Sequence, residues 1–363
     1  MGGHRPQRQP TMSARGSVAA LPRAEDAARL VSTDRGAFRR ALLGWYDQHG
    51  RDLPWRKTRD PYRIWLSEIM LQQTRVAAVL DHYRIFLERF PNLQALAAAS
   101  EDAVLAAWSG LGYYRRARML HQCAKELMRL HNSRFPRSVE ALLALPGIGR
   151  YTAAAIASIA FDEPVAVVDG NVERVLHRLT GIDLTTPQIW RHAQALLESA
   201  RPGDFNQAMM ELGATVCVPG EPRCLVCPVR KWCVTQGEVP RNQPPARQKK
   251  KEIWCTLQWR NGGGDGNGNG KIRLVQRPKK TSLMPGMWEL PQSFEPPLSP
   301  GSARWRTFRH SITVTDYTVH ILRNMSLPAI PAAAKGKWIA IDRISQIPIT
   351  GLTRKILKAG GII

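Results

Sequence analysis

The chain has 363 residues, which is enough for two domains that each bury a core of their own. Its 52 lysines and arginines outnumber 29 acidic residues and give a formal net charge of +23. We therefore expect a polyanionic partner, most simply nucleic acid; a merely soluble basic protein is the alternative. No apolar run reaches the length of a membrane span and no secretory signal core is present, so we expect neither a membrane protein nor a secreted one.

Residues 1–35 are rich in Arg, Pro and Ala and show little periodicity. We interpret them as a disordered basic leader. An organelle transit peptide has a similar composition, and Met12 is an alternative start.

Helical periodicity continues from residue 36 to residue 216. Asp60 followed by Pro61 is typical of a helix start, with Asp as the cap and Pro at the first position. We predict helices over residues 61–73, 115–132, 150–160, 171–179, 187–199 and 205–215, and hence an all-α domain.

The stretch 145–172 combines two features that suit a site. Gly147 and Gly149 permit a tight turn after Pro146, directly before a helix whose first-turn N–H groups and positive dipole end can bind a phosphate. Asp169 then offers a carboxylate just before another helix. Each feature also has a plain interpretation, as an ordinary turn and an ordinary N-cap.

Four of the six cysteines are clustered in residues 217–233, with the spacing C-x6-C-x2-C-x5-C. Four thiolates in so short a loop favour a [4Fe-4S] cluster over zinc, because a four-cysteine zinc site uses two short pairs and only one is present. A structural loop without a partner is the remaining alternative. The candidate ligands are Cys217, Cys224, Cys227 and Cys233.

The other two cysteines, Cys123 and Cys255, lie in apolar patterns that predict burial. Because the six form no disulfide framework, we expect a reducing compartment. The short basic leader and the lack of a recognisable nuclear signal indicate the cytosol of a bacterium.

The pattern changes after residue 233. Residues 234–252 are rich in Pro, Gln and Lys and are predicted to be an interdomain linker. Beyond it, residues 253–363 predict a smaller α+β domain, with strands at 253–259, 271–276, 312–322 and 337–341 and a closing helix at 352–358.

Several motifs resemble one family. The hairpin LPGIGRYTA, the segment VDGNV and the cysteine loop resemble the helix-hairpin-helix DNA glycosylase superfamily, and within it SEIMLQQTRV (67–76) and GLGYYRRAR (110–118) resemble the MutY family of adenine DNA glycosylases. This covers about residues 36–240. QRPKKTSLMPGMWELPQ (276–292) more weakly resembles the MutT/Nudix-like recognition domain of that family, without the Glu-rich metal motif of a pyrophosphohydrolase.

The resemblance implies removal of adenine mispaired with 8-oxoguanine or guanine in duplex DNA by a monomer. It makes Glu68 the acid that protonates N7 of adenine and Asp169 the group that stabilises or traps the oxocarbenium-like sugar, with Tyr151 and Asn171 in support. In the related endonuclease III enzymes a Schiff-base Lys stands at the position of Tyr151, so we predict a monofunctional enzyme.

The resemblance also implies DNA contacts. Gln73 and Tyr113 match residues that wedge into the duplex, with Leu111 nearby, while Gly147 and Gly149 supply backbone N–H groups to phosphate. Such enzymes extrude the target base from the stack.

A Phe-Ser-His loop senses 8-oxoguanine in the family, and this chain departs from it. In one register Ile312, Thr313 and Val314 take the three places; in the other, the segment from Phe308 to His310 does. Thr313 keeps a hydroxyl that donates and accepts.

Three rival functions remain to be weighed. They are an oxidised-pyrimidine glycosylase/lyase, a non-catalytic DNA-binding protein and a nucleotide hydrolase. Tyr151 and the second domain argue against the first, the intact pair Glu68 and Asp169 against the second, and the missing metal motif against the third.

Overall fold

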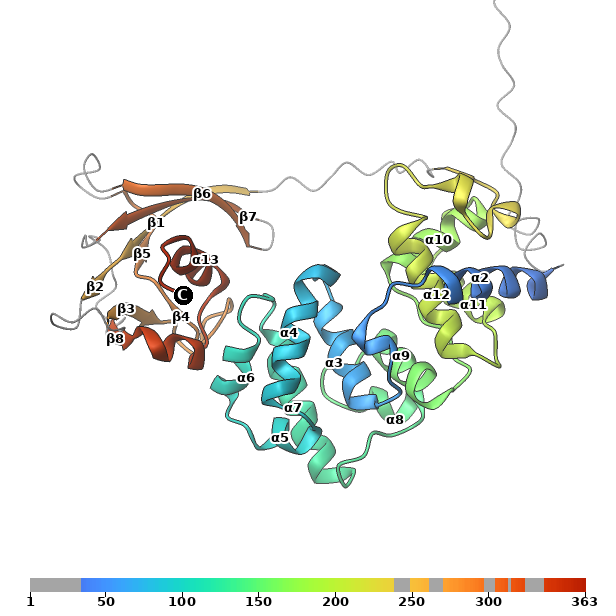
Figure 1. Cartoon of the computed structure of the whole chain (residues 1–363), viewed down its shortest axis with the longest axis horizontal. Helices are drawn as coiled ribbons and strands as arrows, with labels where there is room; N and C mark the ends of the chain where they lie inside the picture. Colours follow the sequence, from blue (N-terminus) through green and yellow to red (C-terminus); the bar gives the residue numbers. More distant parts are fainter. Residues whose placement is uncertain (1–33, 238–248, 261–269, 297–303, 313–314, 324–335) are drawn as a thin grey trace, which may run out of the picture.

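A computed structural model describes residues 34–237, 249–260, 270–296, 304–312, 315–323 and 336–363 (Figure 1). The predicted leader, apart from its last two residues, therefore lies outside the described residues, as does most of the predicted linker. No helix in the described part is long and apolar enough to cross a bilayer.

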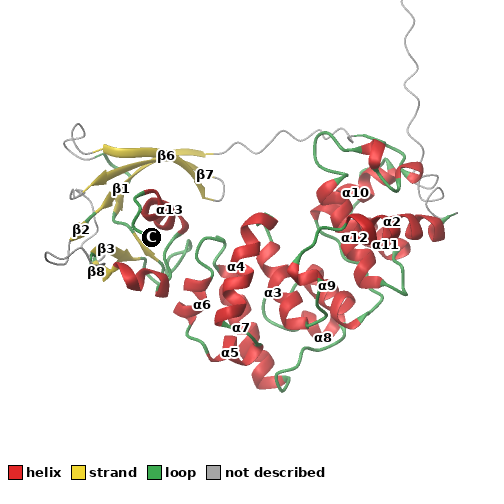
Figure 2. Ribbon diagram, in the orientation of Figure 1, coloured by secondary structure: helices red, strands yellow, loops and turns green. Residues whose placement is uncertain are grey.

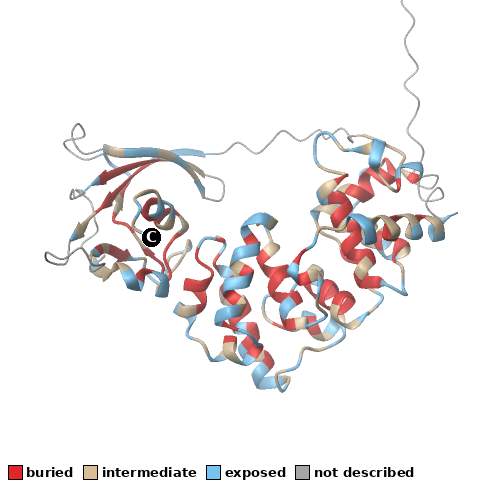
Figure 3. Ribbon diagram, viewed as in Figure 1, coloured by how far each residue is buried: buried red, intermediate tan, exposed pale blue. Residues whose placement is uncertain are grey.

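The amino-terminal part is all-α, as predicted. Its helices are α2 (Arg35–His49), α3 (Pro61–Leu71), α4 (Val76–Arg89), α5 (Leu93–Ala98), α6 (Glu101–Ala107), α7 (Arg115–Leu130), α8 (Val139–Leu143), α9 (Arg150–Phe161), α10 (Gly170–Thr180), α11 (Thr186–Leu196) and α12 (Pro202–Thr215). They form two lobes (Figure 1), each with its own buried cluster. α4 to α7 belong to one lobe, and α2 with α10 to α12 to the other, while α3, α8 and α9 lie between them. Figure 3 shows α9 and α12 as mostly buried.

The start of α3 is as predicted, because the Asp60 side chain accepts from the N–H of Tyr62 at 2.9 Å. Its end is not: α3 stops at Leu71, so Gln73 lies outside the helix and has a left-handed backbone with φ of 55°. The physical reason is the Arg116 side chain, which donates to the carbonyls of Ile69, Met70 and Gln72 and so satisfies this end of the helix from outside.

The carboxy-terminal part is α+β (Figure 2). One sheet has the strand order β5-β1-β7-β6, with β1 (Lys249–Leu257) parallel to β7 (Thr315–Arg323) and β6 (Arg304–Ile312) antiparallel to β7. The other joins β2 (Trp259–Arg260), β3 (Lys271–Gln276) and β4 (Trp288–Glu289), and β8 (Lys337–Ala340) pairs with β3. Strand β5 is Gln292–Ser293, and a 3-10 turn (Ile341–Gln346) leads to α13 (Gly351–Ala359) between the sheets (Figure 2).

Two predictions for this domain are wrong. The segment beginning at Phe308 is not a loop: it lies in β6, where Phe308 pairs with Val319 of β7, and the predicted strand 312–322 is the second half of this hairpin. Pairing between β6 and β7 makes this segment a strand, and the sequence pattern of one strand alone does not reveal such pairing. The domain also begins before residue 253, because the basic triplet Lys249 to Lys251 belongs to β1 and not to the linker.

The two domains contact each other at the loop before α7. Ser109 Oγ and Tyr114 OH each donate to the carbonyl oxygen of Ile349 at 3.0 Å, and Arg354 Nε donates to Ser109 Oγ at 3.0 Å. Met287 of the α+β domain is buried in the core of the helical lobe. Both ends of this loop are therefore hydrogen-bonded to the α+β domain.

Candidate active site

Glu68 lies on α3 facing α9, with only 5% of its surface exposed. The neighbouring Trp65, also buried, belongs to the apolar core around it. Burial raises the pKa of Glu68 to about 7, while a hydrogen bond from Tyr151 opposes the rise. The carboxyl group can therefore carry a proton near neutral pH, as a general acid requires.

Tyr151 is the second residue of α9, and its phenol donates to Oε2 of Glu68. Burial and the two nearby carboxylates hold the pKa of Tyr151 well above its usual value, so the phenol remains a donor. The family resemblance gives Tyr151 a supporting role, and in the structure its hydrogen-bond partner is Glu68.

Asp169 is the N-cap of α10 and also faces the site. Its Oδ1 accepts from the backbone N–H groups of Asn171 and Val172 at 2.9 and 2.8 Å, and its Oδ2 accepts from Asn171 Nδ2 at 2.8 Å. Asn171 is itself fixed, because its Oδ1 accepts from Arg174 at 2.9 Å. Asp169 lies near enough for its charge to contribute to the raised pKa of Glu68. The carboxylate of Asp169 therefore both caps α10 and acts electrostatically on Glu68.

An ion-pair cluster beside Glu68 escaped the sequence interpretation. Glu211 on α12 is fully buried and pairs with Arg51 and Arg56, each at 2.7 Å. Arg56 also acts on Glu68, whose pKa it lowers. The sequence signal is that Glu211 is the single polar residue in the segment 208–214, a pattern typical of a buried and paired carboxylate.

The predicted wedge residues differ in accessibility. Tyr113 is 51% exposed, with φ of 48°, and Gln73 is also exposed. Leu111 is only 6% exposed and packs in the helical core, so its predicted part in DNA contact is not supported by its burial.

The predicted hairpin is built as a phosphate site requires. Gly147 and Gly149 are both exposed, and Gly149 is the N-cap of α9 with no side chain bonded to the first turn. Gly147 has φ of 77°, and a Cβ there would lie 2.6 Å from Met119 Cβ. The first turn of α9 therefore has no side-chain cap, and it follows a turn at Gly147 that has no room for a side chain.

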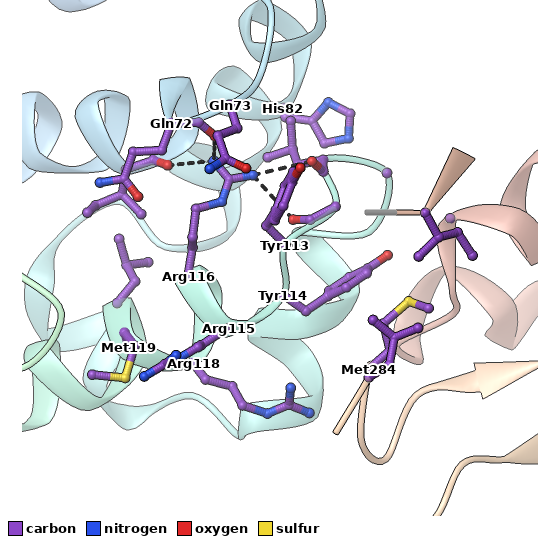
Figure 4. Close-up of a pocket in the computed structure, with 18 of the residues that line it drawn as sticks. Gln72, Gln73, His82, Tyr113, Tyr114, Arg115, Arg116, Arg118, Met119 and Met284 are labelled. Atoms are coloured by element: carbon purple, nitrogen blue, oxygen red, sulfur yellow. Dashed lines mark hydrogen bonds between the residues drawn. The ribbon is translucent and has the colours of Figure 1, made fainter. Parts of the chain in front are cut away.

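A cavity of about 1100 Å³ lies between the two domains (Figure 4). It brings together Gln73, Tyr113 and Gly147 from the helical domain with His310 and Ile312 from β6. Its charged lining residues are all basic: Arg115, Arg116, Arg118, Arg354, Lys355 and Lys358. Glu68, Asp169 and Tyr151 do not line it. Thr313 and Val314 lie outside the described residues.

The four clustered cysteines are half-buried and line one small pocket with Arg178 and Arg230. Arg178 donates to Cys217 Sγ at 3.1 Å, and the N–H of Gln236 donates to Cys233 Sγ at 3.4 Å. In the described part of the chain, no three His, Cys, Asp or Glu side chains are placed to hold a single metal ion. An all-sulfur donor set with N–H donors to sulfur suits an iron–sulfur cluster.

The hairpin before α9, the buried Glu68 and the hydrogen-bonded Asp169 lie in the stretch whose motifs resemble the helix-hairpin-helix class of DNA glycosylases. Residues 66–199 match the model of the HhH-GPD superfamily base excision DNA repair proteins. Over 243 residues the chain is 49% identical to the adenine DNA glycosylase of Mus musculus, covering 62% of this chain and 47% of that one.

The adenine DNA glycosylase of Buchnera aphidicola subsp. Baizongia pistaciae is 37% identical over 236 residues, covering 62% of this chain and 67% of the relative. The chain belongs to the MutY-type adenine DNA glycosylase family. It spans about half the length of its mammalian relatives. A solved thermostable thymine-DNA glycosylase superposes with a TM-score of 0.52 at 32% identity, covering 55% of this chain and 94% of that one.

Proposed function

We propose that this chain is a monofunctional adenine DNA glycosylase of base excision repair. It hydrolyses the N-glycosidic bond of adenine mispaired with 8-oxoguanine, or with guanine, in duplex DNA. The observation that carries the proposal is the pair Glu68 and Asp169: one carboxyl is buried with its pKa raised to about 7, and the other is held by three hydrogen bonds.

The two carboxyls divide the chemistry. Glu68 gives its proton to N7 of adenine, the bond from C1′ to N9 breaks, and the bonding electron pair leaves with the base. Asp169 stabilises the oxocarbenium-like sugar or bonds to C1′ transiently. Glu68, now a carboxylate, takes a proton from the incoming water. Because Tyr151 has no amine, it forms no Schiff base and the strand is not cut.

The exposed hairpin and the basic cavity supply the DNA contacts in this proposal. Gly147 and Gly149 bind a phosphate, and Gln73 and Tyr113 enter the duplex where the adenine leaves it. The opposite base occupies the interdomain cavity beside His310 and Ile312, with Thr313 following in the chain.

We further propose that the cysteines Cys217, Cys224, Cys227 and Cys233 hold a [4Fe-4S] cluster, which fixes the fold of a loop whose Arg and Lys side chains face DNA phosphates. The protein then acts as a monomer in the bacterial cytosol. About four iron atoms per purified chain, lost on Cys227→Ser, are expected for such a cluster.

The test is single-turnover cleavage of a duplex with one 8-oxoguanine:adenine pair, beside one with guanine:adenine, with half of each reaction treated with alkali. We expect breaks only after alkali and faster for the oxidised pair. Equal rates on the two duplexes would show that the chain is an adenine glycosylase that does not distinguish 8-oxoguanine from guanine. Breaks without alkali would show lyase chemistry, and no release of adenine would overturn the proposal.

A further inference from the structure

The side chain of Arg116, in the first turn of α7, lies between the two segments that carry Gln73 and Tyr113 (Figure 4). One guanidinium reaches both. Its Nη1 donates to the carbonyl oxygens of Ile69 at 2.8 Å, Met70 at 3.0 Å and Gln72 at 2.5 Å. Its Nη2 donates to Thr74 Oγ1 at 3.1 Å and to the carbonyl oxygens of Leu111 at 3.3 Å and Gly112 at 3.2 Å.

Both segments need such support because their backbones are unfavourable. Gln73 has φ of 55° and Tyr113 has φ of 48°, a region that costs a residue with a side chain about 1 kcal/mol or more. Such conformations persist only where the surroundings hold them in place. The Arg116 guanidinium is the group that bonds to the chain on both sides, directly next to each of these two residues.

The contacts of Arg116 with two aromatic rings also connect it to Tyr113. Its guanidinium carbon lies 5.5 Å from the centre of the Tyr113 ring and 5.3 Å from that of Trp108. Trp108 is buried, whereas Tyr113 is exposed. The cation therefore joins the exposed ring to the core. Although burial lowers the pKa of Arg116 to about 10, the group stays charged at neutral pH.

We propose that Arg116 is a positioning residue that holds Gln73 and Tyr113 as one preformed wedge, so that base extrusion does not wait for two loops to become ordered. This inference rests on the proposed function. It goes beyond that function because it assigns the geometry of the wedge to a residue that itself does not enter the base stack.

The experiment uses the full chain with Arg116→Met and Arg116→Lys. We expect either change to slow single-turnover cleavage of adenine opposite 8-oxoguanine about 10-fold to 100-fold at saturating enzyme, as a small misplacement does. Lys should not rescue the rate, because one ammonium lacks the planar fork that reaches both segments. Adenine opposite an abasic site is easier to extrude, so the loss there should be under about 3-fold.

Two controls separate positioning from loss of charge or of folding. Arg129→Met removes an exposed cation, paired with Glu126, from the other end of α7 and should leave the rate unchanged. In a double-mutant cycle, Arg116→Met added to the variant that carries both Gln73→Ala and Tyr113→Ala should cost under about 2-fold, because both side chains that it positions are gone. Melting temperatures show which variants are folded.

The outcomes distinguish failure of the positioning role of Arg116 from failure of the proposed function. Equal losses on the mispair and on the abasic-site duplex, additive effects in the cycle, or full rescue by Lys would overturn the positioning role. If the unmodified protein releases no adenine, the proposed function fails instead. Fluorescence of 2-aminopurine in place of the target adenine then decides the inference alone: a weaker rise on binding of the Arg116→Met variant supports it, and an equal rise contradicts it.

Discussion

The phenol of Tyr151 donates a hydrogen bond to the carboxylate of Glu68, and the two residues come from different helices, α9 and α3. Burial of Glu68 favours its protonated form, whereas this bond favours the ionised form. Tyr151 therefore limits how far the pKa of the acid rises, in addition to leaving the site without an amine at that position.

Substituting Tyr151→Phe should move the alkaline limb of the single-turnover pH–rate profile to higher pH. The donor that stabilises ionised Glu68 is removed, so the pKa of Glu68 rises further above about 7 and the acid stays protonated over a wider range. Rates measured from pH 5 to pH 10 check this. An unmoved limb, or one moved to lower pH, would show that the phenol does not act on the acid.

Glu68→Gln should lower the cleavage rate by a factor of about 10² to 10⁴, while binding to the mispair persists. It should also change how stability depends on pH. The pKa of Glu68 in the folded chain, about 7, lies above the ordinary 4.5, so the folded state binds more protons between these values and stability falls as pH rises through that window. The Gln variant should lack this fall.

Denaturant unfolding at pH 5 and pH 8 measures the difference. A shift from 4.5 to about 7 corresponds to about 3 kcal/mol, so the Gln variant should gain on the unmodified chain by an amount of that order at pH 8 relative to pH 5. The same pH dependence in both proteins would mean that Glu68 titrates normally and that its role as an acid at neutral pH is wrong.

Local signals in the sequence account for much of the fold. The Asp60 cap, the burial of Cys123 and Cys255 and the hairpin at Gly147 are confirmed, since each follows from a residue and its immediate neighbours. The closing helix that the sequence predicts at 352–358 is confirmed as α13, which spans Gly351–Ala359. The roles of the catalytic pair stay a prediction.

What the sequence could not reveal depends on contacts between distant segments. Arg116 lies on α7 and donates hydrogen bonds to the carbonyl groups at the end of α3. Glu211 forms ion pairs with Arg51 and Arg56, which lie far from it in the sequence. The β6–β7 hairpin arises from pairing between strands, and the pattern of either strand alone did not identify it. Periodicity reports which face of an element is buried, but not which partner covers it.

Asp169→Asn should abolish turnover with little loss of stability. Asn is as good an N-cap as Asp, so the bonds from the backbone N–H groups of Asn171 and Val172 persist, and only the side-chain bond from Asn171 Nδ2 is lost. The negative charge that stabilises the sugar cation is gone. Cleavage assays and thermal melts on the same samples separate the two effects. A folded variant that still releases adenine at the normal rate would refute this role of Asp169.

Glu211→Gln should destabilise the chain by about 3 kcal/mol, because it leaves the partly buried Arg56 without its charged partner. Burial alone would raise the pKa of Glu211, yet the bonds from Arg51 and Arg56 lower it to about 2. The stabilisation is therefore present above the ordinary pKa of 4.5 and is lost as pH falls toward 2. The difference between the two proteins should shrink in acid.

The control for Glu211 is Glu88→Gln, which breaks an exposed pair with Arg84 on α4. Such a surface pair contributes about 0.5 kcal/mol or less. Urea unfolding of both variants at pH 7 and pH 3 is the measurement. Equal effects of the two substitutions, or a Glu211 effect that is constant with pH, would show that the buried cluster is not a structural ion pair.

Gly147→Ala should destabilise the hairpin and weaken binding to DNA. The backbone there has φ of 77°, and the added Cβ would lie 2.6 Å from Met119 Cβ, so either the turn or α7 must move. We expect a loss of about 1–3 kcal/mol. Thermal unfolding and titration with an undamaged duplex check both effects.

Gly149→Ala is the matched control, two residues further along the same turn. Its φ is −92° and a Cβ there would meet nothing within 4 Å, so the fold should tolerate Ala with a change of about 0.5 kcal/mol or less. The two variants add the same methyl group to the same surface. If both lose stability equally, the left-handed turn at Gly147 is not what shapes the phosphate site; if only Gly147→Ala loses stability and binding together, the turn and the site are one structure.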